Sequence, residues 1–298
     1  MGNHLFDLIK ARMPAPTAPF AFLDDGRTCS YADMVALSAR FANALVGLGV
    51  KPGDRVAVQV EKSLEALMLY LGTVRAGAIF LPLNTAYTPA EIEYFLGDAE
   101  PTVFVCDPAK AEALKPFADK AGAKLETLGV GAGSLLEKAN AAATEFADVA
   151  RGADDLAAIL YTSGTTGRSK GAMLSHDNLA SNALALVDYW RFSKDDVLLH
   201  ALPIFHTHGL FVATNTILLA GASMILLPKF DPEQVFKYLP RATSMMGVPT
   251  FYVRLLQDQR LSKEAVKHMR LFVSGSAPLL AETPGRGKPT VPATRSPS

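Results

Sequence analysis

The chain of 298 residues is long enough to bury a large core, either as one big domain or as two ordinary ones. Hydrophobic residues make up 49% of it and charged residues 19%, which is the composition of a folded globular protein and excludes a disordered one. The 29 basic and 29 acidic residues cancel to a net charge of zero, so the sequence gives no sign of a nucleic-acid-binding protein.

The amino-terminal segment has no long apolar run, and its sixth residue is Phe6, so neither a secretory signal nor a myristoylation pattern is predicted. The eighteen residues from Leu210 to Leu227 carry no charge, which is the lower limit for a membrane-spanning helix. However, Asn215 and Thr216 interrupt this stretch, and Gly221 lies in a break. We therefore expect a buried helix, a turn and a buried strand there, and no membrane span.

Short β-branched runs alternate with helical stretches along most of the chain. The first pair is a strand over Arg55–Val60, followed by a helix with apolar residues at helical spacing. Another helix is predicted from Thr88, because Pro89 suits the first helical position and Glu91 completes a capping box. Further strands are expected at 79–83, 102–106, 197–203 and 271–275, and further helices at 107–122, 178–190 and 231–240. This alternation predicts an α/β fold with βαβ units, largely parallel sheets and flanking helices.

The two cysteines, Cys29 and Cys106, are far apart and lack the CxxC or Cys/His spacing of a zinc site. We expect both to be buried thiols in a reducing compartment, which favours a cytoplasmic protein without a disulfide framework.

The pattern changes near Glu282, since the last 17 residues hold four prolines and no apolar periodicity. Such a segment cannot bury enough apolar surface to become ordered. We therefore expect a domain over residues 1–281 and a disordered, Pro/Arg-rich tail over residues 282–298. Both a native disordered terminus and a shifted reading frame would explain this tail.

A loop rich in hydroxyl groups and glycine lies within Tyr161–His176, which reads YTSGTTGRSKGAMLSH. Such hydroxyls and glycine amides can form a concave set of donors for phosphate oxygens, and Lys170 adds a positive charge. The helix that starts near Ser175 could add the positive end of its dipole. The loop is not a Walker A motif, because Ser169 stands where a glycine is needed. Composition alone is equally consistent with a polar surface turn.

The whole string resembles the phosphate-binding loop of the adenylate-forming superfamily, which includes acyl-CoA synthetases, luciferases and the adenylation domains of peptide synthetases. Ser169 is one departure, since the family usually has proline there. Three further stretches resemble the family in order and spacing, namely LPIFHTHG at 202–209, GVPTFYVRLL at 247–256 and LFVSGSAPL at 271–279. The resemblance extends to about Leu280, is closest to the malonyl-CoA synthetase branch, and implies the large N-terminal domain of the adenylate-forming fold.

The resemblance implies an AMP-forming acid–thiol ligase of fatty acid metabolism that uses ATP, Mg²⁺ and coenzyme A. An acid would attack the α-phosphate of ATP, and the thiol of coenzyme A would then displace AMP from the acyl-adenylate. The phosphates would be held by Thr162, Ser163, Gly164, Thr165, Thr166, Gly167 and Lys170, with Thr165 and Thr166 also near the metal. Lys170 would stabilise the charge of the departing pyrophosphate. The turn that flanks the adenine would be Gly275, Ser276, Ala277 and Pro278.

The resemblance also places His206 beside the acyl pocket and the adenylate, as a catalytic and substrate-binding residue. For an isolated histidine, a satisfied core position would be the simpler interpretation. His208 matches no motif, and we expect it to be structural.

In the malonate-activating branch, an arginine and a serine at the positions of Arg254 and Ser276 receive the distal carboxylate, which suits the planar fork of a guanidinium. The alternative is an exposed Arg254 paired with Asp258 on a helix.

After Leu280 the sequence departs from the family. Relatives continue with an aromatic-Gly-x-Thr-Glu segment, an aspartate for the ribose and a mobile C-terminal domain with a catalytic lysine, and none of these is present. We therefore expect impaired catalysis. Three interpretations stay open: a synthetase for malonate or a similar short dicarboxylic acid, one for another small carboxylic acid, and a non-catalytic nucleotide-binding chain.

Overall fold

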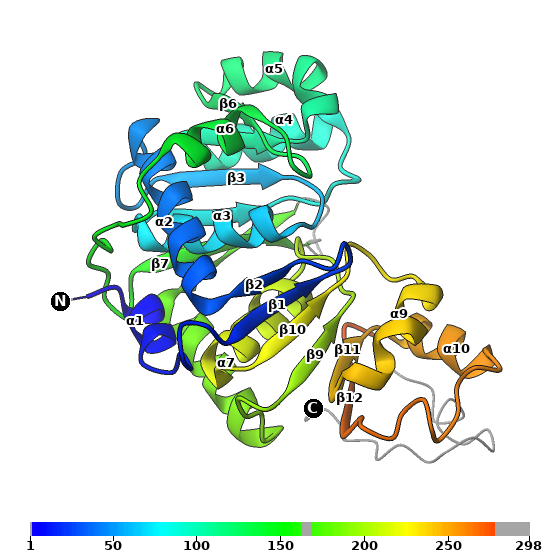
Figure 1. Cartoon of the computed structure of the whole chain (residues 1–298). Coiled ribbons are helices and arrows are strands. Elements are labelled where there is room, and N and C mark those ends of the chain that lie inside the picture. The colour runs from blue at the N-terminus through cyan, green and yellow to red at the C-terminus, as the bar shows by residue number, and fades with distance from the viewer. Residues whose placement is uncertain (1, 163–168, 278–298) are drawn as a thin grey trace. The chain divides into compact units, whose positions relative to one another are not determined.

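The computed structural model describes residues 2–162 and 169–277. The chain divides into two compact units (Figure 1). The first comprises Met1–Ala11, Ala32–Asn182 and Phe205–Thr207, and the second comprises Arg12–Tyr31, Ala183–Ile204 and His208–Ser298. Within the described ranges, no helix combines the length and the apolar character that crossing a membrane requires.

The first unit is built on a six-stranded sheet with the order β6-β5-β3-β4-β7-β8. Its strands are β3 (Arg55–Gln59), β4 (Ile79–Pro82), β5 (Val103–Cys106), β6 (Lys124–Thr127), β7 (Leu156–Thr162) and β8 (Lys170–Ser175). The pairs from β6 to β7 are parallel, and β8 runs antiparallel to β7. β4 and β5 are buried along their whole length, as is typical of parallel strands that helices cover on both faces.

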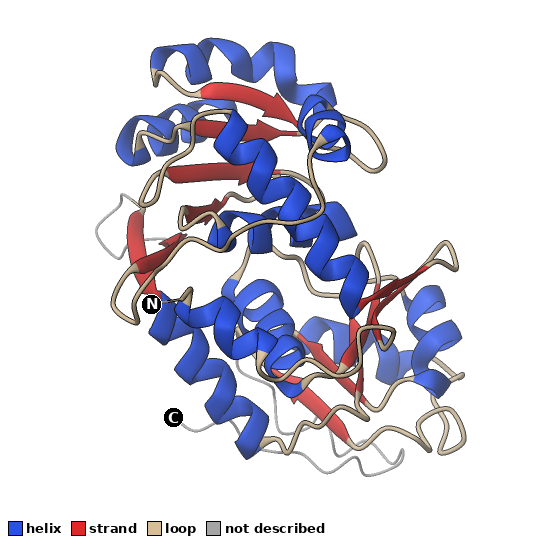
Figure 2. Ribbon diagram, turned by 60° about the vertical axis from the view of Figure 1, so that its left-hand side comes forward, coloured by secondary structure: helices blue, strands red, loops and turns tan. Residues whose placement is uncertain are grey.

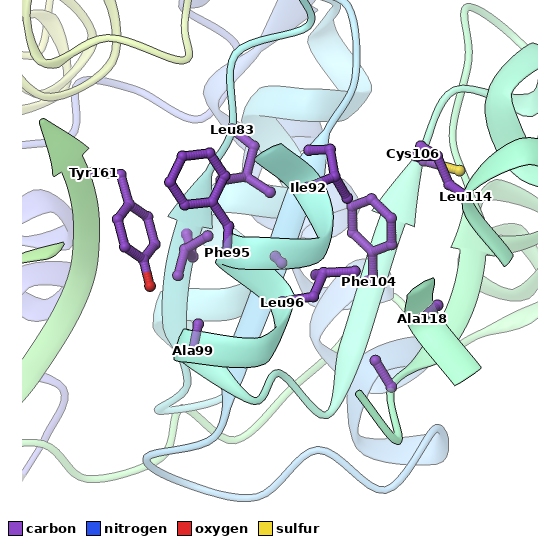
Figure 3. Close-up of a cluster of buried hydrophobic side chains, with 13 residues drawn as sticks. Leu83, Ile92, Phe95, Leu96, Ala99, Phe104, Cys106, Leu114, Ala118 and Tyr161 are labelled. Atoms are coloured by element: carbon purple, nitrogen blue, oxygen red, sulfur yellow. The ribbon is translucent and has the colours of Figure 1, made fainter. Parts of the chain in front are cut away.

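Helices cover both faces of this sheet, as the ribbon in Figure 2 shows. They are α1 (His4–Lys10), α2 (Tyr31–Gly47), α3 (Leu64–Arg75), α4 (Pro89–Ala99), the 3₁₀ turn η1 (Pro108–Lys110), α5 (Ala111–Lys120) and α6 (Ser134–Ala141). On one face, Phe95 of α4, Leu114 of α5 and Phe104 of β5 belong to one buried hydrophobic cluster (Figure 3). On the other face, the ring of Tyr70 in α3 lies 5.3 Å from that of Phe80.

The second unit contains a sheet with the order β12-β11-β9-β10-β1-β2. Its strands are β1 (Pro19–Leu23), β2 (Thr28–Ser30), β9 (Val197–His200), β10 (Ser223–Leu226), β11 (Ser244–Gly247) and β12 (Leu271–Ser274). Only the β1–β2 pair is antiparallel among these described strands. β9, β10 and β12 match strands predicted from the sequence, whereas β11 and the β1–β2 hairpin were not predicted.

The helical segments of the second unit are the π-helix η2 (His208–Thr214), α8 (Asn215–Ala220), α9 (Pro232–Tyr238), the 3₁₀ turn η3 (Leu239–Arg241) and α10 (Pro249–Gln257). Helix α7 (His176–Tyr189) begins in the first unit and ends in the second. Val235 of α9 and Leu255 of α10 share a buried cluster with Leu199, Ile225 and Met245, which come from three neighbouring strands. α9 and α10 therefore cover one face of this sheet.

Several local predictions are confirmed. Thr88 and Glu91 form the expected capping box at the start of α4. The uncharged stretch from Leu210 to Leu227 forms a helix, a turn and a buried strand, and Gly221 ends the helix with a φ of 65°. Cys29 and Cys106 are both buried, and burial raises the pKa of Cys106 to about 11.

A bidentate ion pair aligns the amino ends of three strands in the second unit. Asp196 precedes β9 and is buried, and its two carboxylate oxygens each lie 2.7 Å from a nitrogen of Arg270, which precedes β12. Thr243, which precedes β11, donates its hydroxyl to the same carboxylate. Burial raises the pKa of Asp196, but the hydrogen bonds from Arg270 and Thr243 outweigh it, so the net pKa is lowered. Three residues that directly precede neighbouring strands are thereby linked at the amino edge of the sheet.

Candidate functional site

The two ends of the predicted phosphate loop face each other in the first unit. Thr162 is the last residue of β7, Lys170 is the first of β8, and the two are partners in the β7–β8 register. Both are exposed. The residues between them that the sequence analysis assigned to phosphate and metal, Ser163, Gly164, Thr165, Thr166 and Gly167, lie outside the described residues. The pairing thus brings Lys170 to the base of the loop.

Helix α4 anchors both ends of this loop. The hydroxyl of Tyr94 donates to the carbonyl oxygen of Ser169 at 2.9 Å, and the hydroxyl of Tyr161 donates to Asp98 at 2.5 Å. Burial raises the pKa of Tyr161, and the hydrogen bond to Asp98 raises it further, so its hydroxyl keeps the proton that it donates. The ring of Tyr161 also lies 4.5 Å from that of Phe95 in the same helix (Figure 3).

The helix after β8 does not contribute as expected. We anticipated that a helix starting near Ser175 could lend its dipole to the loop, but α7 starts at the far end of β8 from Lys170. The length of this strand corresponds to about 17 Å. Since the effect of a helix dipole falls off within its first turn, that expectation is wrong.

The predicted adenine-flanking turn follows β12 in the second unit. Ser274 is the partner of Gly247 in the β11–β12 register, and the amide of Gly275 donates to the carbonyl of Gly247 at 3.1 Å. Ser276 is exposed, and its φ of 67° lies in the left-handed region. Ala277 is also exposed, and Pro278 lies outside the described residues. The turn therefore lies at the carboxyl edge of the sheet, where ligands of open α/β sheets typically bind.

Arg254 is an exposed residue of α10, in the same unit as Ser276. Its guanidinium carbon lies 5.1 Å from the centroid of the Phe230 ring. The neighbouring Asp258 accepts hydrogen bonds from Arg260 at 2.7 and 3.0 Å. Arg254 therefore makes a cation–π contact in the second unit.

His206 is exposed, so the alternative of a satisfied core histidine is wrong. Its ring lies 4.5 Å from that of Phe205, and desolvation lowers its pKa, which favours a neutral imidazole at pH 7. His206 belongs to the first unit together with Lys170, whereas Arg254 and Ser276 belong to the second.

His208 has a contact that the sequence analysis missed. Its Nδ1 lies 3.3 Å from the Oγ of Ser276, and its ring packs against Gly275. Tyr94 and Asp98 were missed as well, although their spacing of four residues places both on one face of α4. A second histidine within FHTHG was the available signal for His208.

No group of three or more His, Cys, Asp or Glu side chains that could hold a metal ion occurs within the described part of the chain. Since the hydroxyls of Thr165 and Thr166 lie outside it, the Mg²⁺ assignment stays a prediction.

Comparisons with known proteins show what this chain is similar to. A family model described as AMP-binding enzyme matches residues 10–293. Feruloyl-CoA synthase from Amycolatopsis sp is 35% identical over 263 residues, covering 88% of this chain and 52% of that protein. The mitochondrial malonate–CoA ligase ACSF3 of Homo sapiens is 31% identical over 282 residues, covering 87% of this chain and 48% of that protein.

Among solved structures, ATP-bound MatB from Rhodopseudomonas palustris matches with a TM-score of 0.93 and 60% sequence identity. The match covers 96% of this chain and 57% of that one. The chain spans about half the length of the curated relatives that it matches.

Proposed function

This chain belongs to the AMP-binding enzyme family, and on that premise we propose that it is the ATP- and acid-binding part of an AMP-forming acid–CoA ligase. The fold is that of the large N-terminal domain of adenylate-forming enzymes. The observation that carries the proposal is the anchored loop, in which Thr162 and Lys170 are register partners while Tyr94 and Asp98 fix the residues beside them.

The proposed reaction has two steps. A carboxylate oxygen of the acid attacks the α-phosphorus of ATP, which forms an acyl-adenylate and releases pyrophosphate. The thiol of coenzyme A then attacks the acyl carbonyl, and AMP leaves. In the first step, Lys170 and the donors of the loop stabilise the negative charge that accumulates on the β- and γ-phosphates. Mg²⁺, held by Thr165 and Thr166, would neutralise part of that charge.

For the acid we propose malonate or a similar short dicarboxylate. Malonate–CoA ligases are among the relatives, and Arg254 and Ser276 both lie in the second unit as exposed side chains. The distal carboxylate of such an acid can accept two parallel hydrogen bonds from a guanidinium. A fatty or aromatic acid has no carboxylate at its distal end and cannot accept them. Another small carboxylic acid is the competing substrate, since feruloyl-CoA synthase is 35% identical to this chain and the human malonate–CoA ligase 31%. We place the protein in the cytoplasm, because its two cysteines are far apart in the sequence and both are buried, as expected of thiols in a reducing compartment.

Calorimetric titration of ATP into the chain tests the loop assignment. Lys170→Ala should weaken ATP binding at least about tenfold, which corresponds to the loss of one charge-assisted contact. Lys115→Ala is the matched control, since Lys115 is another exposed lysine of the first unit and pairs with Asp119 instead. If Lys170→Ala binds ATP as tightly as the control does, the loop does not hold the phosphates and the proposal fails.

A further inference from the structure

We propose that His208 is a positioning residue for the acid, which sets the direction of the Ser276 hydroxyl so that it donates to the distal carboxylate. This inference rests on the proposed function and deepens it, because it names a residue that decides which acid the second unit accepts.

The ring of His208 contacts two residues of the turn, Gly275 and Ser276. The Nδ1 of His208 lies 3.3 Å from the Oγ of Ser276. A Cβ atom on Gly275 would lie 2.9 Å from the Cε1 of the same ring, which is closer than such atoms come in real proteins. Glycine at 275 therefore lets the imidazole lie directly against the backbone of the turn. Ser276 is exposed and has a left-handed φ of 67°, which is uncommon for a residue with a side chain.

The backbone beside His208 is fixed by contacts of the Gly209 carbonyl with two buried side chains, His200 and Thr214. His208 begins the π-helix η2, and the carbonyl of Gly209 lies 2.8 Å from the Nε2 of His200. His200 is buried at the carboxyl end of β9, where it is the register partner of Met246 in β11. Thr214 donates its hydroxyl to the same carbonyl at 3.0 Å. A π-helical turn fixed in this way is a feature that occurs frequently at functional sites.

The hydrogen count of the pair decides what Ser276 can bind. A serine hydroxyl has a single hydrogen. If the Nδ1 of His208 carries no hydrogen, the hydroxyl donates to it and presents only lone pairs to an arriving carboxylate. If Nδ1 carries the hydrogen, it donates to Oγ, and the hydroxyl hydrogen is free to point at the carboxylate. The second arrangement gives the carboxylate a donor whose direction the imidazole fixes.

Burial lowers the pKa of His208, so its ring is neutral at pH 7 and carries one hydrogen. A neutral ring can hold this hydrogen on either nitrogen, so adopting the Nδ1–H form requires no proton from solvent. His208 thus differs from Arg254, which would attract the carboxylate by charge, because His208 acts only through the serine.

A double-mutant cycle on the full chain tests this, with malonate and ATP affinities measured by calorimetry. His208→Leu should weaken malonate binding about tenfold and leave ATP binding within about twofold. In the Ser276→Ala background, the same change should cost less than about twofold, because the hydroxyl that His208 directs is gone. His208→Asn, which can donate from its amide to Oγ, should restore malonate binding to within about threefold of the wild type.

The outcomes separate the two claims. If the wild-type chain binds ATP but not malonate, the proposed acid is wrong and the role of His208 falls with it. If the wild type binds malonate and His208→Leu loses the same factor with and without the Ser276 hydroxyl, only the positioning role is wrong. A loss of ATP binding in His208→Leu and in His208→Asn alike would identify His208 as a purely structural residue and would also overturn the inference.

Discussion

The hydroxyl of Tyr94 lies 2.9 Å from the carbonyl oxygen of Ser169, the residue directly before Lys170. Helix α4 thereby holds the chain at the point where the proposed phosphate loop returns to the sheet. Four residues further along the helix, Asp98 accepts the hydroxyl of Tyr161 at the other end of the loop. Side chains of a single helix thus hold the chain at both ends of the loop.

Removal of the Tyr94 hydroxyl should loosen the loop without unfolding the unit. Loss of one hydrogen bond of this kind costs about 1 kcal/mol, so Tyr94→Phe should weaken ATP binding roughly two- to tenfold while malonate binding stays the same. Tyr87→Phe is the matched control, because the Tyr87 ring lies 4.8 Å from that of Phe95 in the same aromatic cluster. Equal ATP affinities of the two variants in calorimetry would mean that the anchor does not matter for binding.

Arg254 should decide between a dicarboxylate and its monocarboxylate analogue. Arg254→Met should reduce malonate binding at least about tenfold and leave propionate, in which a methyl group replaces the distal carboxylate, within about twofold. Arg254→Lys keeps the charge but loses the planar fork, so it should recover only part of the affinity. Competition calorimetry with both acids measures this. Unchanged preference for malonate in Arg254→Met would assign the distal carboxylate to other residues.

His176 should make the stability of the first unit depend on pH. It is fully buried at the start of α7, and its Nδ1 accepts the backbone amide of Leu5 at 3.4 Å. Burial, together with the nearby charge of Arg151, lowers its pKa to about 4. Since the folded pKa lies below the unfolded one, the folded state binds fewer protons in this window, and stability is lost as the pH falls from about 6.5 towards 4.

The expected loss of unfolding free energy between pH 7 and pH 5 is about 2 kcal/mol from this residue. His176→Asn keeps an acceptor near the position of Nδ1 but does not titrate, so its stability should fall less over the same range. Urea denaturation of both chains at the two pH values gives the comparison. Parallel losses would show that His176 is not responsible.

The ion pair of Asp196 and Arg270 should stabilise the second unit. Arg270→Met would leave a buried carboxylate with fewer partners, which should lower the free energy of unfolding by about 2 kcal/mol or more. Arg260→Met is the control, because Arg260 also pairs with two acidic side chains, Asp258 and Glu233, but neither of them is buried, whereas Asp196 is. Exposed pairs contribute about 1 kcal/mol or less. Urea denaturation that ranks the two variants equally would contradict this account.

Elements with local signals could be predicted from the sequence. β3 is an apolar run bounded by turn residues, and α4 begins with a capping box, so residues close in the chain determine both. The β1–β2 hairpin was missed because β1 is placed by its partner, with Ala21 in register with Met224. A local sequence pattern cannot indicate a strand pairing between residues so far apart in the chain.

The candidate site shows the same division. The loop from Thr162 to Lys170 and the turn at Ser276 could be identified, because each resembles a continuous motif. The contact of His208 with Ser276 joins residues 68 positions apart and depends on the absence of a side chain at Gly275. The role of Tyr94 depends on which face of α4 meets the loop. Both are consequences of packing, which sequence spacing alone does not give.

The most direct test of the account is the release of pyrophosphate from ATP by the purified chain, with malonate, with propionate and without an acid. The account predicts release that depends on the acid, is faster with malonate than with propionate, and falls at least about tenfold in Lys170→Ala. Binding of ATP with no release under any of the three conditions would contradict the prediction that this part of the ligase carries out the first step by itself, and would favour a nucleotide-binding chain without turnover.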